Sequence, residues 1–295
     1  MKRRPTDTIP HNFLGLNEKY SDYNAARFAV LPVPYDAAAS FLPGARHAPA
    51  AIINASYHLE WFDEELEVEA YDCGVATLDA LEPSLDGPEA MHERIFKHAR
   101  RVVRDGKIPI GLGGDHSVTA GLVRAVMTKH KKLSVLQIDA HLDLRDRFLG
   151  SRFAHACVMR RCLEMGATIV PVGIRAVSPS EHRFVKRHPI EPITARDCHM
   201  EDEWIDRVLN GLGEKVYVTM DIDAFDPSFA PGTGTPEPGG LDWYQVTGLL
   251  RLVAAEKRIV GADIVEVLPI PGQVVTEFLA ARLAYKLMAY IQHEA

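Results

Sequence analysis

The stretch VLQIDAHLD (residues 135–143) decides how the rest of the chain is interpreted. Its first four residues are mostly apolar and predict a strand that is buried on both faces. Side chains alternate along an extended segment, so Asp139, His141 and Asp143 would project to the same side. Two carboxylates and an imidazole that converge are costly to bury unless a cation lies between them. The stretch therefore predicts either a metal site at a strand end or three ordinary polar residues in a loop.

Strands alternate with helices over most of the chain. This alternation predicts an α/β fold, with a mostly parallel sheet of about eight strands and helices on both faces. In such sheets the ligand site lies beyond the carboxyl ends of the strands. The predicted strands are 28–33, 73–78, 108–112, 133–138, 168–172, 190–193, 216–220 and 258–267, and the predicted helices are 49–57, 89–104, 118–129, 157–165, 179–187, 201–209, 242–256 and 275–292.

The composition is that of an ordinary globular protein, with 295 residues, 47% hydrophobic and 25% charged. This length suits one large α/β domain, and no linker, repeat or low-complexity segment divides it. We therefore expect a single domain over residues 1–295. Residues 1–24 are polar and aperiodic, and we expect them to form an arm or to cover an edge of the sheet.

Charge and cysteine content narrow the choice of partners and compartment. A net charge of −7 argues against nucleic acid as a partner. No run of 18 apolar residues is present, and the N-terminus lacks the apolar segment of a signal peptide. The four cysteines form no CxxC pair. We therefore expect no membrane span and a location in the reducing cytoplasm.

Two further polar clusters follow predicted strands. Asp221 and Asp223 come after strand 216–220, and His116 lies in GGDHS (113–117) after strand 108–112. Taken alone, an Asp-x-Asp pair is usually a solvated turn, and a lone histidine usually caps or packs. Together with the first cluster they give two imidazoles and four carboxylates, whose formal charge of about −4 would be balanced by two divalent ions.

The donor set indicates the metal and the chemistry. Oxygen ligands with a minority of imidazole suit Mn²⁺, with Mg²⁺, Fe²⁺, Co²⁺ and Ni²⁺ as alternatives, and the absence of thiolates argues against structural zinc. Two ions about 3.5–4 Å apart lower the pKa of a water molecule between them and so produce a nucleophile at neutral pH. The predicted reaction class is metal-assisted hydrolysis.

Three segments in this order resemble the ureohydrolases, the arginase/agmatinase family of dimanganese guanidino hydrolases. They are GGDHS (113–117), DAHLD (139–143) and MDIDAFDPSFAPGTGTP (220–236). The resemblance extends over roughly residues 28–292. It implies the three-layer arginase-like fold, two Mn²⁺ per subunit, urea as a product and a homo-oligomer, a trimer or a hexamer.

The resemblance also implies roles for single residues. The metal ligands would be His116, Asp139, His141, Asp143, Asp221 and Asp223, with Asp139 and Asp223 bridging the ions. Asp143 would in addition receive the proton from the bridging hydroxide. His155 matches a mobile-loop histidine that shuttles protons, although the usual following glycine is Ala156 here. Glu266 matches the carboxylate that binds the guanidinium, a role in keeping with bidentate pairing.

The agmatinase branch of the family is the one that the sequence favours. In arginase the Gly-x-Arg segment is followed by acids that bind the α-ammonium group, whereas Ala176 and Ser178 occupy those positions here. The expected reaction is therefore hydrolysis of agmatine to putrescine and urea. Guanidinobutyrate, guanidinopropionate, guanidine and arginine remain alternative substrates, and a non-catalytic regulatory homologue is the remote alternative.

Overall fold

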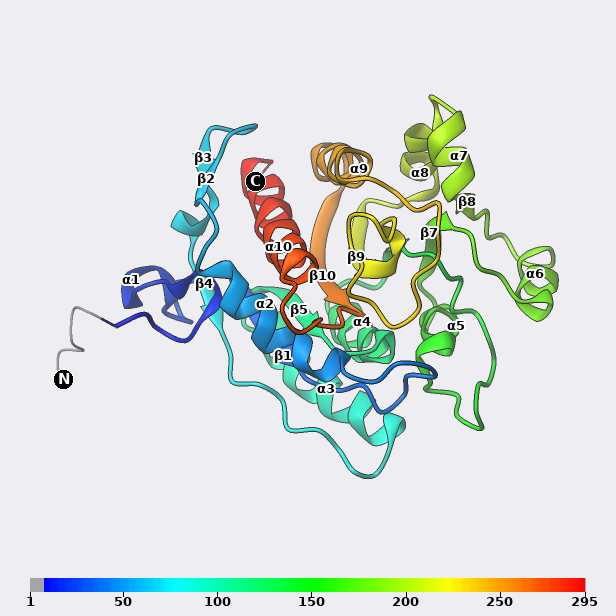
Figure 1. Ribbon diagram of the computed structural model, residues 1–295, viewed down its shortest axis with the longest axis horizontal. Helices are drawn as coiled ribbons and strands as arrows, with labels where there is room; N and C mark the ends of the chain where they lie inside the picture. The colour runs from blue at the N-terminus through cyan, green and yellow to red at the C-terminus, as the bar shows by residue number, and fades with distance from the viewer. Residues whose placement is uncertain (1–7, 295) are drawn as a thin grey trace.

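The strand that precedes the Asp-x-His-x-Asp segment is β6 (Ser134–Ile138), and all five of its residues are buried. The computed structural model, which describes residues 8–294, places β6 inside an eight-stranded sheet (Figure 1). It pairs in parallel with β7 on one side and β9 on the other. Burial on both faces explains why the run is apolar rather than alternating.

Every neighbouring pair in this sheet is parallel, which confirms the predicted α/β fold with a mostly parallel sheet. The strand order is β4-β1-β5-β10-β9-β6-β7-β8. The strands other than β6 are β1 (Phe28–Val33), β4 (Val75–Thr77), β5 (Ile108–Gly113), β7 (Thr168–Ile174), β8 (Ile193–Thr194), β9 (Lys215–Asp221) and β10 (Arg258–Val265).

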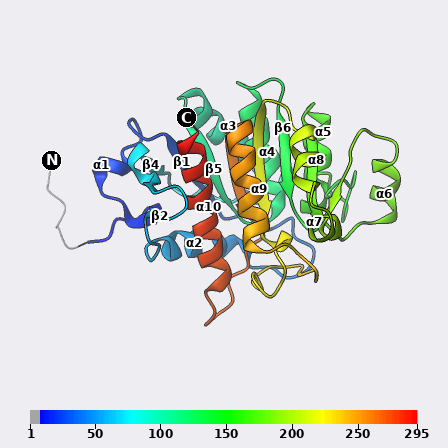
Figure 2. The same ribbon diagram turned by 90° about the horizontal axis from the view of Figure 1, so that it is seen from above.

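Helices cover both faces of the sheet and give the expected three layers (Figure 2). Two separate apolar clusters lie between these layers, one on each face of the sheet. One face carries α2 (Ala48–Ser56), α8 (Trp204–Gly211), α9 (Trp243–Glu256) and α10 (Val275–His293), and the other carries α3 (Pro88–Arg104), α4 (Thr119–Met127) and α5 (Val158–Glu164). The remaining helices are α1 (Glu18–Ser21), α6 (Pro179–Val185) and α7 (Ala195–Met200).

Capping residues set the starts of several helices. Asp242 caps α9: its carboxylate accepts from the Gln245 N–H, while the Gln245 side chain accepts from the Asp242 N–H. Ser178 and Thr194 form the same reciprocal arrangement at α6 and α7. Such capping boxes satisfy backbone donors that a helix start leaves without partners.

Some elements differ from the sequence-based expectation. Helix α7 and a small antiparallel hairpin, β2 (Phe62–Asp63) and β3 (Val68–Glu69), were not predicted. Two-residue strands and a six-residue helix are too short to produce a periodic signal. The hairpin is fixed instead by a tertiary contact, since Lys286 of α10 lies 2.9 Å from Asp63 and 2.9 Å from Glu65.

The N-terminal segment contributes buried apolar side chains, although its composition is mostly polar. Residues 1–7 lie outside the described residues, but Phe13, Leu14 and Leu16 are at most 2% exposed. The backbone N–H of Phe13 donates to Thr77 of β4, and that of Leu14 donates to Ser56 of α2. From residue 8 onward the segment therefore covers the β4 edge, rather than extending as a free arm. Over residues 8–294, no helix combines the length and apolar character needed to cross a bilayer.

Candidate metal centre and active site

Four adjacent strands, β5, β10, β9 and β6, direct their carboxyl ends towards the same place. The loops after these ends carry all the predicted metal ligands, together with Glu266. His116 follows β5, Glu266 follows β10, Asp221 and Asp223 lie at the end of β9, and Asp139, His141 and Asp143 follow β6. The sheet therefore brings together residues that are far apart in the sequence.

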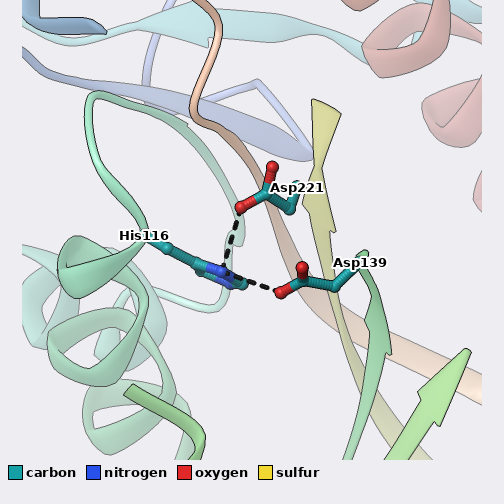
Figure 3. A group of neighbouring side chains, drawn as sticks. All are labelled: His116, Asp139 and Asp221. Carbon is teal, nitrogen blue, oxygen red and sulfur yellow. Dashed lines mark ion pairs between the residues drawn. The ribbon is translucent and has the colours of Figure 1, made fainter. Parts of the chain in front are cut away.

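His116 is fully buried, and its Nδ1 atom faces three carboxylates. The Nδ1 atom lies 3.2 Å from Asp139 Oδ2, 3.1 Å from Asp143 Oδ2 and 3.3 Å from Asp221 Oδ2. Figure 3 shows its ring directed between Asp139 and Asp221. None of the three contacts has hydrogen-bond geometry, so Nδ1 has no hydrogen-bonding partner among the described residues.

The opposite ring nitrogen of His116 explains this arrangement. Nε2 lies 2.9 Å from the Thr219 hydroxyl, which itself donates to Asp263 over 2.6 Å. Because the proton of that hydroxyl goes to Asp263, Nε2 is the donor in the bond to Thr219. Burial would lower the pKa of His116, but the three carboxylates raise that pKa well above its usual value. With a cation at this place the ring would be neutral and would present its Nδ1 lone pair to the ion. A cation between Nδ1 and these oxygens would also relieve the repulsion among the carboxylates.

A second group of ligands shares Asp139 with the first. His141 Nδ1 lies 2.9 Å from Asp223 Oδ2 and 3.7 Å from Asp139 Oδ1. One potential ligand atom from each of these three residues lies within 4.8 Å of the others, and the same holds for His116, Asp139 and Asp221. Asp139 therefore lies between two candidate cation positions.

Burial excludes the interpretation of these acids as solvated loop residues. The exposed fractions are 0% for Asp139, 5% for Asp143, 3% for Asp221 and 1% for Asp223. Four buried carboxylates carry more negative charge than two imidazoles can compensate, even when both are protonated. Two divalent cations would balance the four carboxylates, so these residues fit a two-metal centre.

The electrostatic environment raises the pKa values of three residues of the cluster. Burial raises the pKa of Asp143 to about 7; the His116 ring opposes this shift and the Asp139 carboxylate adds to it. Burial would lower the pKa of His141, but its bonds to Asp139 and Asp223 raise that pKa to about 12. Burial also raises the pKa of Asp221 far above its usual value. All three shifts reflect buried charge that the protein alone does not neutralise.

Two site residues have left-handed backbones that the surrounding structure holds in place. Asp143 has φ 51°, and its carbonyl accepts from the N–H groups of Met159 and Arg160 at the start of α5. Glu266 has φ 60°, and its N–H donates to the Gly114 carbonyl over 2.7 Å. Left-handed backbones are unfavourable for residues with a side chain and persist where surrounding bonds fix them, often at functional sites.

His155 and Glu266 lie next to each other beside the ligand cluster. His155 Nδ1 is 3.6 Å from Glu266 Oε1, and the same oxygen accepts from the His116 N–H over 2.7 Å. Burial strongly raises the pKa of Glu266, and the Asp115 carboxylate adds to this shift. A buried carboxylate with such a pKa is well suited to receive a cationic group.

Several residues that support this site were not identified from the sequence. The Gln137 amide donates to Asp139 Oδ2 over 2.8 Å, and Thr219 and Asp263 orient His116 as described above. Each of them is a polar residue within a buried strand. A polar side chain inside an apolar run is a detectable signal, because burial requires it to have a partner.

Arg175 holds the loop that follows β9. Its guanidinium donates to the carbonyls of Asp223, Phe225 and Glu237, at 2.6, 3.3 and 2.7 Å. The Gly-x-Arg segment (173–175) therefore serves the structure of this loop. Ser178, at a position that the sequence comparison with arginase singled out, donates to Glu181 and caps α6.

A cavity of about 520 Å³ lies at the opposite edge of the sheet, at the amino ends of β5 and β10. Its lining includes Lys107, Lys129, Lys257 and Arg258, and none of the predicted site residues. The cavity is therefore separate from the ligand cluster at the carboxyl ends of the strands.

The family model for the arginase family matches residues 26–290. The chain belongs to the arginase family. Among curated relatives, an N(1)-aminopropylagmatine ureohydrolase from Synechocystis is 40% identical over 95% of this chain and 94% of that protein. A Thermus thermophilus protein of the same name is 42% identical over 92% of both chains. An agmatinase from Pyrococcus horikoshii is 37% identical over 83% of this chain and 85% of that protein.

Solved structures agree with these sequence relationships. The agmatine ureohydrolase of Thermoplasma volcanium superposes with a TM-score of 0.86 and 31% identity, covering 98% of this chain and 96% of that chain. Proclavaminate amidino hydrolase from Streptomyces clavuligerus gives a TM-score of 0.90 at 29% identity, covering 99% and 100%. The arginase-like fold and the assignment to the agmatinase branch are therefore confirmed, and the protein is a ureohydrolase of the agmatinase type.

Proposed function

We propose that the protein hydrolyses agmatine or its N(1)-aminopropyl derivative to urea and the corresponding amine, with two Mn²⁺ per subunit. The observation that carries this proposal is the buried Nδ1 atom of His116, directed at three carboxylates. The names of the 40% and 42% identical relatives extend the substrate range beyond agmatine alone. The metal ligands in this proposal are His116, Asp139, His141, Asp143, Asp221 and Asp223.

The donor set favours manganese and a shared ligand. Carboxylate oxygens outnumber imidazole nitrogens, which suits Mn²⁺ better than zinc. Asp139 belongs to both candidate groups, in keeping with a bridging role, and Asp223 is assigned the second bridge by resemblance. Two bound ions would lower the pKa of a water molecule and supply a nucleophile at neutral pH.

Protein side chains perform the remaining steps. Glu266 pairs with the guanidinium of the substrate, since a buried carboxylate in this position offers two oxygens to a planar donor. Asp143 accepts a proton from the attacking water, a role that the resemblance implies and that its place beside His116, 3.1 Å from Nδ1, allows. His155 lies 3.6 Å from Glu266, and burial lowers its pKa to about 4, so it is neutral at rest. It therefore relays a proton, taken from the solvent, to the amine that leaves.

The segment after β7 disfavours arginine as the substrate. Ala176 lies beside His141, with which it forms an isolated parallel bridge, and it has no charge to offer an α-ammonium group. Ser178 uses its hydroxyl within the α6 cap. An amino-acid head group would therefore find no acid at either position, whereas an alkylamine needs none there.

A urea-release assay with added Mn²⁺ tests the proposal. The substrates compared are agmatine, N(1)-aminopropylagmatine, arginine and guanidinobutyrate, and Asp223→Ala serves as the inactive control. We expect the highest kcat/KM for one of the first two compounds. Urea from guanidinobutyrate or arginine alone would contradict the proposed specificity, and no urea from any compound would contradict the proposed enzyme activity.

We also propose that the protein acts in the cytoplasm as a homo-oligomer, a trimer or a hexamer. The resemblance to the family and the absence of paired cysteines motivate these two proposals. Sedimentation equilibrium on the full chain gives the number of subunits directly, and a monomer at micromolar concentration would contradict the oligomer.

A further inference from the structure

The ring of His155 lies between two side chains. Its Nε2 atom is 2.9 Å from the hydroxyl oxygen of Ser40, and its Nδ1 atom is 3.6 Å from Glu266 Oε1. The histidine side chain is only 15% exposed. One ring nitrogen therefore faces the group that is proposed to bind the guanidinium, and the other is held by Ser40.

Ser40 belongs to a segment that is fixed at both ends. Asp36 accepts from the N–H groups of Gly44 and Arg46 over 2.8 and 3.1 Å, and its carboxylate also pairs with the Arg46 side chain. These contacts close residues 36–46 into a loop with a defined shape.

The same loop is attached to both parts of the site. The Ala38 N–H donates to Asp115, the residue before His116, over 2.8 Å. The Ala38 carbonyl accepts from the backbone N–H of His155 over 3.5 Å. The loop thus connects the His116 segment to the His155 segment, and Ser40 is the residue whose side chain reaches the imidazole.

We propose that Ser40 is a positioning residue that fixes the orientation of the His155 ring and remains bonded to Nε2 in every protonation state. This inference rests on the proposed role of His155 in proton transfer. A hydroxyl can both donate and accept a hydrogen bond, so Ser40 can pair with Nε2 whether or not that atom carries a proton. A backbone carbonyl or N–H in its place could pair with only one of the two states.

The neighbouring aromatic ring cannot replace this contact. Phe148 packs against His155 in an edge-to-face arrangement, with ring centroids 5.9 Å apart. Such packing restricts the plane of the imidazole. It does not distinguish Nδ1 from Nε2, because an apolar ring offers no hydrogen-bond partner in the ring plane. The polar contact from Ser40 is what directs Nδ1 towards Glu266.

Kinetics of single and double variants test the inference. Ser40→Ala should lower kcat roughly five- to tenfold, the loss of one hydrogen bond, with little change in KM. Ser40→Thr keeps the hydroxyl and should recover most of the rate. The double variant Ser40→Ala/His155→Ala should be no slower than His155→Ala alone, because Ser40 acts only through that ring.

Metal content and thermal stability should be unchanged in Ser40→Ala. Ser180→Ala, which removes another exposed hydroxyl, is the matched control and should behave like the unaltered protein. An unaltered kcat in Ser40→Ala, or additive losses in the double variant, would overturn the inference.

A measurement without turnover separates this inference from the proposed function. The imidazole ¹⁵N resonances of His155, assigned by their absence in His155→Ala, report on the bond to Nε2. They should shift in Ser40→Ala and stay in place in Ser180→Ala. If the unaltered protein released no urea, the proposed function would fail, yet these shifts would still support the contact; unchanged resonances in Ser40→Ala would refute it.

Discussion

The Thr219 hydroxyl fixes the His116 ring so that Nε2, 2.9 Å away, is the nitrogen that carries the proton of the neutral ring. This relationship leaves the Nδ1 lone pair for a metal ion. Outer hydrogen bonds of this kind orient ligand histidines and raise their basicity. Thr219→Val keeps the shape of the side chain and removes the bond, so the affinity for the metal should fall roughly 10- to 100-fold.

Competition with a chelator of known affinity measures this loss. Thr247→Val is the matched control, since the Thr247 hydroxyl donates to the Trp243 carbonyl of α9 and is not part of the ligand cluster. Equal metal affinity in Thr219→Val and the unaltered protein would show that Thr219 does not orient the ligand.

Removal of a proposed metal ligand should reduce the number of bound ions as well as the rate. His116→Ala and Asp223→Ala should each retain fewer than two Mn²⁺ per subunit after dialysis, as measured by elemental analysis. Asp226→Asn changes an acid in the same loop outside the cluster and should retain both ions. A variant of His116 or Asp223 with two tightly bound ions and normal turnover would contradict the ligand assignment.

Glu266→Gln tests the proposed substrate contact apart from the metal. The amide keeps the oxygen that accepts from the His116 N–H but loses the charge that pairs with a guanidinium. Breaking a buried ion pair costs about 3–5 kcal/mol, so kcat/KM should fall at least roughly 100-fold. The metal content should stay normal. Glu277→Gln, at another buried glutamate, is the control. A rate close to that of the unaltered protein would exclude Glu266 as the guanidinium ligand.

Chelation should destabilise the fold, because four buried carboxylates then repel one another. A ligand present at a free concentration of about 100 times its Kd adds about 2.7 kcal/mol to the free energy of unfolding. Loss of the metal should therefore lower the Tm by roughly 5–10 °C. The Tm of Asp223→Ala should respond less to chelator, since one acid and one site are already lost. An identical Tm with and without chelator would argue against metal in the cluster.

A buried histidine on α3 predicts how stability depends on pH. Burial, with the nearby Arg124 charge, lowers the pKa of His92 to about 4, while an unfolded histidine titrates near 6.5. The unfolded chain therefore binds a proton that the folded chain does not. The contribution of neutral His92 to the free energy of unfolding is fully present above pH 6.5 and is lost as the pH falls towards 4. At pH 4.5 the loss should be roughly 2 kcal/mol.

Urea denaturation at pH 7 and pH 4.5 measures this effect. His92→Leu should lose less stability between the two pH values than the unaltered protein does. His58→Asn, at an exposed histidine, should not alter the difference. If His92→Leu showed the same pH dependence as the unaltered protein, His92 would not be the group responsible.

The boundaries of most elements follow from local sequence patterns. The strand predicted at 28–33 is β1 without any shift, and the helix predicted at 242–256 is α9, with Asp242 as its capping residue. The strand predicted at 190–193 is observed only as the pair Ile193–Thr194, because these are the residues that pair with β7. The hairpin β2–β3 depends on Lys286, far away in the chain, and no local pattern could predict it.

The sequence alone determined which chemical groups lie at strand ends. A buried strand followed by Asp-x-His-x-Asp places its acids and its imidazole at the edge of the sheet, because the apolar residues avoid water and the polar ones begin where the strand ends. The extended conformation does not continue to Asp143, whose φ is 51°, so the loop and not strand alternation brings that carboxylate into the cluster. The rule that polar residues begin where a strand ends identified Asp139, His141, Asp143 and the ends of two other strands. The order of three motifs along the sequence also identified the family.

Only the tertiary structure decided how these groups meet. The order β5-β10-β9-β6 places the strand that leads to Glu266 between those that lead to His116 and Asp221, although β10 is the last described strand in the chain. Packing between helices and sheet fixes that order, and local patterns carry no information about it. The same holds for the bond from Thr219 to His116 and for the approach of Ser40 to His155. These contacts join segments distant in sequence, so they exist only once the chain has folded.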